Sequence, residues 1–110
     1  MMIKLMRLKR NFQILIEALI DVSEYLISVM RWRTPKSYRD VIKILHENSI
    51  IDIEIAKKID ECIVLRNVLV HNYIYINPQE LYMNVKNCLD VIAKTMIILL
   101  NYLASRGIDP

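Results

Sequence analysis

The sequence predicts an all-α fold, an antiparallel up-down bundle of four to five helices in a single domain. Apolar residues recur every three or four positions over long stretches, the spacing that gives a helix one buried face. Only one glycine and three prolines occur in 110 residues, so the chain has few residues that form hairpins and tight turns. Hydrophobic residues make up 55% of the chain, enough for a substantial core. The many isoleucines favour strands, but the helical spacing outweighs them.

The first expected helix runs from about Ile3 to Met30. Two adjoining apolar rows mark its buried side: Leu8, Phe12, Leu15, Leu19, Val22, Leu26 and Val29 in one, and Ile16, Ile20, Ile27 and Met30 in the other. A helix that is apolar on two rows can pack inside its own bundle and against a second chain, so we expect a homodimer. Thr34-Pro35 limits this helix, because proline disfavours a helical residue before it.

Two further helices are expected in the middle of the chain. The second runs from about Ser37 to Glu47 and is ended by Asn48-Ser49. Its apolar face consists of Val41, Ile44 and Leu45. Asp52 is a suitable N-cap for the third helix, which extends to about His71.

The fourth helix has the clearest start. Asn77 can cap it, Pro78 suits the first helical position, and Glu80 completes a capping box. Its apolar positions are Leu81, Val85, Cys88, Ile92, Leu99 and Leu103. Arg106 and Gly107 suit its C-terminal end.

A cytoplasmic location and no membrane partner are expected. A membrane-spanning helix needs about 20 largely apolar residues, and we expect no segment of the chain to span a membrane. Charged residues interrupt the segment Ile14 to Met30, while Val91 to Leu103 is short and contains Lys94. The N-terminus has no uninterrupted apolar region followed by a cleavage site, so no signal peptide is expected.

The two cysteines, Cys62 and Cys88, are too far apart for a CxxC motif. In a cytoplasmic protein such residues are most often buried, reduced thiols. Two histidines and two cysteines without HExxH spacing are a poor ligand set for zinc. We therefore expect no metal site and no cofactor.

The chain is mildly basic, with a net charge of +3 and a pI near 8.9. Its cations form two groups in sequence: Arg31, Arg33, Lys36, Arg39 and Lys43 in one, and Lys4, Arg7, Lys9 and Arg10 in the other. Such groups can bind phosphates. A solvated basic surface is an equally good interpretation of either group alone.

Arg66 is the unusual residue of the third helix. At about 100° per residue, it falls in the middle of an apolar stripe formed by Ile55, Ile59, Cys62, Ile63, Leu69 and Val70. An arginine cannot lose its charge, so it needs an anion there. Asp21 or Glu17 could supply a carboxylate, and a ligand phosphate is the other alternative. His71 lies about 140° round an ideal helix from Arg66, so the two converge only if the helix ends near His71.

The segment Arg66-Asn67-Val68-Leu69-Val70-His71-Asn72-Tyr73 resembles the Arg-x4-His-x-Tyr motif of the HEPN superfamily, specifically the HepT-like proteins that pair with minimal nucleotidyltransferases. Ile16 to Val22 and Thr34 to Tyr38 are similar to the family's flanking patterns, so the resemblance covers about Phe12 to Leu103. It implies that residues 1–110 form one HEPN-like domain. It further implies a homodimer whose two motifs face each other across the two-fold axis.

The resemblance also implies a function, that of a ribonuclease toxin in a toxin–antitoxin pair. Arg66 and His71 would be the catalytic residues of a metal-independent cut in RNA. Asn67 and Tyr73 would bind or orient the substrate. The partner nucleotidyltransferase (the antitoxin) would neutralise the toxin by attaching AMP to Tyr73.

Two other interpretations stay open. The chain can be a non-catalytic binding subunit or substrate of a nucleotidyltransferase, with Arg66 holding a nucleotide phosphate. It can also be a purely structural helical dimer with Arg66 paired to Asp21. An arginine in an apolar stripe is more often part of a structural ion pair, and a histidine near a helix end is more often a C-terminal cap.

Overall fold

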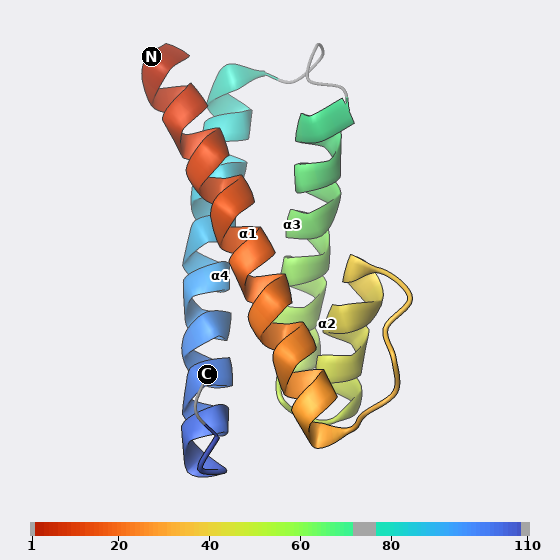
Figure 1. Cartoon of the computed structure of the whole chain (residues 1–110). Helices are drawn as coiled ribbons and strands as arrows, with labels where there is room; N and C mark the ends of the chain where they lie inside the picture. The colour runs from red at the N-terminus through yellow and green to blue at the C-terminus, as the bar shows by residue number, and fades with distance from the viewer. Residues whose placement is uncertain (1, 72–76, 109–110) are drawn as a thin grey trace.

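Helices account for nearly all of the computed structural model, which describes residues 2–71 and 77–108 (Figure 1). The four helices of these residues are α1 (Met2–Met30), α2 (Tyr38–Glu47), α3 (Ile53–His71) and α4 (Pro78–Ser105). The all-α class is therefore confirmed, and each helix lies where the apolar spacing and the caps predicted it.

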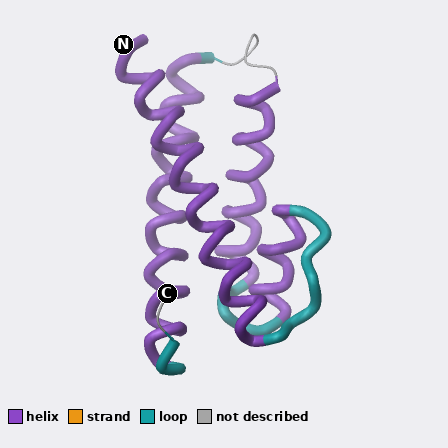
Figure 2. Tube along the Cα trace, in the orientation of Figure 1, coloured by secondary structure: helices purple, strands orange, loops and turns teal. Residues whose placement is uncertain are grey.

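The long helices α1, α3 and α4 lie side by side along a bundle that measures 44 × 23 × 20 Å. Helix α2 packs beside the N-terminal half of α3 (Figure 1). From α2 to α4 the helices alternate in direction, as expected for an up-down bundle. Residues 31–37 instead climb the side of the bundle (Figure 2), so α2 runs in the same direction as α1.

The core is built from the buried faces of all four helices. On α1 this face is centred between the two predicted rows, around Phe12, Ile16, Leu19 and Ser23, which are at most 2% exposed. The Ser23 hydroxyl is satisfied there because it donates to the Leu19 carbonyl at 2.7 Å. Leu15 and Val29 of the first predicted row lie outside this core, since they are 42% and 39% exposed in the single chain.

Side-chain caps begin three of the helices, and two of them, Asp52 and Asn77, are the predicted cap residues. Ser37 accepts a hydrogen bond from the Asp40 amide at the start of α2. Asp52 Oδ1 accepts from the Ile55 amide at 2.8 Å at the start of α3. Asn77 Oδ1 accepts from the Gln79 and Glu80 amides at the start of α4. These bonds satisfy amide groups that have no partner within the helix.

Helices α1, α2 and α4 end in the same backbone arrangement, the Schellman motif. In each, an amide just past the helix donates to the carbonyl five residues earlier: Trp32 to Ile27, Ile50 to Leu45 and Ile108 to Leu103. The preceding residue adopts a left-handed conformation: Arg31 (φ 57°), Ser49 (φ 60°) and Gly107 (φ 69°). The end predicted at Gly107 is confirmed, and α1 already ends four residues before Thr34.

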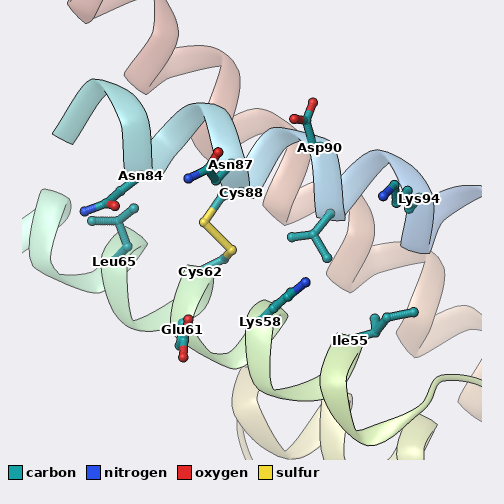
Figure 3. A pocket seen from close by; sticks show the side chains of 11 residues that line it. Ile55, Lys58, Glu61, Cys62, Leu65, Asn84, Asn87, Cys88, Asp90 and Lys94 are labelled. Atoms are coloured by element: carbon teal, nitrogen blue, oxygen red, sulfur yellow. A yellow bond between two sulfur atoms is a disulfide. The ribbon is translucent and has the colours of Figure 1, made fainter. Parts of the chain in front are cut away.

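The two cysteines lie where the antiparallel helices α3 and α4 pack together. Both are buried, as predicted, with Cα atoms 5.7 Å apart. Their sulfur atoms form a disulfide (Figure 3), so the prediction of reduced thiols was wrong for this structure. Neighbouring antiparallel helices bring together residues 26 positions apart, which the CxxC criterion does not consider.

Helix α4 also corrects an expectation. By length and composition, it is apolar enough to cross a membrane, although no segment was expected to be. In this structure its apolar side forms part of the core through residues such as Leu81, Val85, Ile92 and Leu99. Its opposite side exposes polar residues that include Asp90 and Lys94. A core helix of a bundle meets the same test of length and composition.

Candidate functional site

Arg66 lies near the end of α3, at a point where three helices meet. Its Nη2 contacts Glu17 Oε1 of α1 at 3.3 Å, and its Nη1 donates to Asn67 Oδ1 at 3.2 Å. Its guanidinium also lies over the Tyr38 ring of α2, 5.6 Å from the ring centre. Of the two carboxylates considered from the sequence, the structure therefore selects Glu17 rather than Asp21.

The Arg66 guanidinium has bonding partners, but they use only part of its hydrogen-bonding capacity. Its side chain is 22% exposed, whereas that of Glu17 is 53% exposed, so the ion pair opens to solvent on the carboxylate side. Arg66 Nε is buried without a hydrogen-bond partner in the described part of the chain. A guanidinium carries five N–H donors, and the two hydrogen bonds above use only two of them. The arrangement leaves donors that can bind an oxyanion in place of Glu17.

The other described motif residues lie toward the C-terminal end of α3. His71 is the last described residue of α3, and because the residues after it lie outside the described part of the chain, the predicted helix end stays a prediction. Asn67 lies beside Arg66 and is exposed, and its amide oxygen is held by the arginine. Asn72 and Tyr73 lie outside the described residues. The convergence of His71 and Tyr73 on Arg66 therefore stays a prediction.

Tyr38 is the residue of this site that reasoning from the residues alone did not place. Its contact with Arg66 joins two helices that are far apart in the sequence, so no local spacing indicates it. The only signal was the resemblance, since Tyr38 ends the segment Thr34 to Tyr38 that is similar to a family pattern. A cation over an exposed aromatic ring is stabilised modestly, by roughly 0.5–1 kcal/mol, and the ring helps to orient the guanidinium.

Arg33, in the loop of residues 31–37, forms ion pairs with carboxylates near both ends of α2. Its guanidinium forms a two-pronged pair with Asp40, both distances being 2.8 Å. It also bonds the Glu47 carboxylate at 2.9 and 3.0 Å. These hydrogen bonds lower the pKa of the Asp40 and Glu47 carboxyls below their ordinary values and raise the pKa of Arg33. Arg39 forms a similar pair with Asp60 of α3, at 2.7 and 2.8 Å.

A separate groove of about 700 Å³ lies between α3 and α4 (Figure 3). The Cys62–Cys88 disulfide lies at its floor, and its rim carries polar residues: Lys58, Glu61, Asn84, Asn87, Asp90 and Lys94. Of the described motif residues, Arg66 and Asn67 do not line it. Within residues 2–71 and 77–108, no three histidine, cysteine or carboxylate side chains are arranged to hold a metal ion.

The arrangement of helices is similar to that of several solved structures, one of which is named as a HEPN toxin. A tri-AMPylated HEPN toxin of Shewanella oneidensis, in complex with an MNT antitoxin, superposes with a TM-score of 0.76 at 24% identity over 84% of this chain and 70% of that one. A toxin–antitoxin structure with AMP-PNP gives 0.77 at 23% identity, with the same coverage. YutE of Bacillus subtilis, a cytosolic protein of unknown function, gives 0.77 at 25% identity over 90% of this chain and 69% of that one.

The family follows from the sequence match. The model of the family described as Ribonuclease HepT-like matches residues 2–97. The chain therefore belongs to the HepT-like family of the HEPN superfamily, as the motif around Arg66 indicated. No curated protein matches the chain in sequence.

Proposed function

We propose that this protein is the toxin of a toxin–antitoxin pair and cuts RNA without a metal ion, through a site composed of Arg66 and His71 from two chains. The observation that carries the proposal is the state of Arg66. Its fixed charge is held near the helix end by a carboxylate that is half in water, and it keeps unused donors. That is the condition in which an RNA phosphate can replace Glu17.

The chemistry requires a base, an acid and a cation. One His71 accepts the proton of the ribose 2′-OH while that oxygen bonds to phosphorus. The bond from phosphorus to the 5′-oxygen breaks, and the second His71 donates a proton to the leaving oxygen. Arg66 binds the phosphate oxygens, on which charge accumulates. The products are a 2′,3′-cyclic phosphate and a free 5′-hydroxyl.

A homodimer supplies the second histidine, because His46 lies on α2 and outside the motif. Exposed apolar residues of the bundle favour such a dimer. Leu15, Val22 and Val29 share one stripe of α1, at helical spacing, and are exposed or half-buried. Ile97 and Leu100 of α4 are 59% and 38% exposed. Uncovered apolar surface of this kind is typical of an interface.

The decisive test is a ribonuclease assay in EDTA with the wild type, His71→Ala and Arg66→Ala. His46→Ala is the matched control, since it removes the other histidine of the chain. We expect His71→Ala to lower the cleavage rate by at least about a hundredfold, with His46→Ala unchanged and a cyclic phosphate on the product. The proposal fails if His71→Ala, verified as folded by circular dichroism, cuts as fast as the wild type.

Modification of Tyr73 by a partner nucleotidyltransferase is the second part of the proposal. It is supported by family membership and by the AMPylated state of the similar Shewanella toxin. Incubation with the cognate enzyme and ATP should add whole AMP units to the wild type, read by intact mass, and abolish cleavage. Tyr73→Phe should block the first addition, whereas Tyr75→Phe should not. An unchanged mass with the active enzyme would exclude this part.

A non-catalytic subunit is the alternative, in which Arg66 holds a nucleotide phosphate for the nucleotidyltransferase. The half-buried guanidinium supports phosphate binding equally well. The two functions separate in one comparison, because a binding subunit would bind ATP through Arg66 and leave RNA intact. Both functions place the protein in the cytoplasm, and the similar YutE is described as cytosolic.

A further inference from the structure

We propose that a basic surface between α2 and α3 binds the RNA strand on one side of the cleavage site, an inference that rests on the proposed function. This surface, the α2–α3 basic surface, is a shallow hollow of about 920 Å³. Its cations are Arg33, Lys36, Arg39, Lys43 and Lys57. The sequence had indicated four of them as a basic group, and the fold adds Lys57 from α3.

The surface keeps a positive charge after its internal pairs are formed. Five cations face three carboxylates, those of Asp40, Glu47 and Asp60. All three carboxylates are engaged by the two arginines. Among the described residues, no salt bridge involves Lys36, Lys43 or Lys57. Because the whole chain has a net charge of +3, an excess of two positive charges here is a large share of the total.

The surface and the described part of the motif share one face of α3. Lys57, Asp60, Val64 and Asn67 are spaced three or four residues apart, so they share one face of the helix. The distance from Lys57 to Asn67 is about 15 Å at 1.5 Å per residue. An RNA strand that lies along this face reaches from Lys57 to Asn67, whose side chain is hydrogen-bonded to Arg66. On the α2 side, Tyr38 contacts Arg66 at the motif end of this face.

The chemistry of the surface fits single-stranded RNA better than a protein partner. Ammonium groups at several points along a path suit successive phosphates. The Tyr38 ring is 43% exposed at the motif end, where it can stack on a base. The anchors of protein interfaces are mostly tryptophan, tyrosine and arginine, and both arginines of this surface are already paired with carboxylates. Among the residues that line the hollow, Ile53 is the exposed large hydrophobic one.

The test compares two triple variants that change the net charge equally. The first is Lys36→Gln with Lys43→Gln and Lys57→Gln. The control is Lys58→Gln with Lys86→Gln and Lys94→Gln, which alters α3 and α4 around the other groove. Binding of a fluorescent 20-nucleotide single-stranded RNA is measured by anisotropy over a salt series, in a His71→Ala background that prevents cleavage. Cleavage of the same RNA is measured with His71 intact.

We expect the first triple variant to weaken RNA binding about tenfold and to reduce the salt slope by about 2, since each single-strand phosphate contact contributes about 0.7. The KM for RNA should rise while kcat stays within about twofold, because the surface holds the strand and not the reacting phosphate. The control variant should retain binding close to the wild type.

Each other outcome overturns the inference, and the readouts separate it from the proposed function. Equal losses in both triple variants would mean general charge attraction. Unchanged RNA binding in the first variant, with cleavage intact, would leave the ribonuclease standing and remove this surface. Loss of antitoxin binding alone would assign the surface to a protein. A wild type that neither binds nor cuts RNA would refute the proposed function and this inference with it.

Discussion

Arg66 obtains its counter-charge from a carboxylate that is itself largely in water. The helical projection predicted that this residue needs an anion, and the structure supplies Glu17 at 3.3 Å. The sequence did not decide between Glu17 and Asp21, since both lie on α1 and the choice depends on how α1 is rotated against α3. That rotation follows from packing of the whole core. The role of His71 depends on its side chain and on a second chain, so it stays a prediction.

A double-mutant cycle on Glu17→Gln and Arg66→Met measures the strength of this pair. Because Glu17 is more than half exposed, we expect a coupling of at most about 1 kcal/mol in the free energy of unfolding. Chemical denaturation of the four proteins provides the values. A coupling of about 3 kcal/mol or more would instead describe a structural ion pair, and would favour the non-functional interpretation of Arg66.

Arg33 should make the stability of the protein depend on acid pH. Its hydrogen bonds lower the pKa of Asp40 and Glu47 in the folded state, so the unfolded chain binds protons first as the pH falls. The stabilisation is complete above the ordinary carboxyl range, near pH 4, and is lost progressively below it. The difference in unfolding free energy between the wild type and Arg33→Met should therefore be largest near pH 7 and shrink below about pH 4.

Urea denaturation of the wild type and Arg33→Met at pH 7, 5, 4 and 3 measures this difference in unfolding free energy. Arg10→Met is the matched control, because Arg10 is exposed on α1 and forms no salt bridge with any described residue. Its difference from the wild type should vary little with pH. A difference for Arg33→Met that stays constant from pH 7 to 3 would show that its ion pairs do not contribute.

At the scale of the helix, the sequence predicted the positions of starts and ends, but it showed the chemistry of the starts more clearly than that of the ends. Asp52 and Asn77 were predicted as caps because their side-chain chemistry is visible in the sequence, and Ser37 caps α2 in the same way. The ends of α1 and α2 instead use Arg31 and Ser49 in a left-handed conformation. Neither residue type signals such a position, because the usual residue there is glycine. Gly107 supplies the usual residue only at the end of α4, whereas the ends of α1 and α2 were predicted from Thr34-Pro35 and Asn48-Ser49.

Replacing Arg31 by glycine should stabilise the protein. A side chain in the left-handed region costs about 1 kcal/mol, which glycine avoids. Arg31 is exposed, and no hydrogen bond or salt bridge of its side chain occurs within the described residues. We therefore expect Arg31→Gly to raise the free energy of unfolding by about 0.5–1 kcal/mol, measured by thermal and urea denaturation.

Two variants control for this prediction. Arg31→Ala removes the same side chain but keeps a Cβ atom, so it should not stabilise. Gly107→Ala should destabilise by about 1 kcal/mol, and the loss would be conformational, because a Cβ there meets no atom within 4 Å. Equal stabilisation by Arg31→Gly and Arg31→Ala would contradict the backbone explanation.

At the scale of the molecule, the sequence predicted the helices and their number better than their arrangement. Apolar spacing is a local property, whereas the direction of α2 is set by the path of residues 31–37 and by the Arg33 pairs that hold it. The disulfide was missed for the same reason. It depends on which helices become neighbours, and the spacing rules for cysteine motifs describe only local sites.

The disulfide should contribute measurably to stability when it is formed. A link between residues 26 positions apart lowers the conformational entropy of the unfolded chain. In the chain-entropy model this stabilises the folded protein by about 3.5 kcal/mol. The wild type should therefore unfold at a lower temperature in dithiothreitol, while a Cys62→Ala, Cys88→Ala protein should not respond. Two free thiols in unreduced native protein, with no effect of dithiothreitol, would show that the link does not form.

The same link closes part of the polypeptide into a ring. Residues 62–88 form a covalent loop, and the whole segment from Arg66 to Tyr73 belongs to it. A protease that cuts this segment once would therefore leave the oxidised protein as a single molecule of nearly unchanged mass, with both halves still joined through sulfur. Two fragments would separate only after reduction, so a cut at the motif would pass unnoticed on a gel run without a thiol.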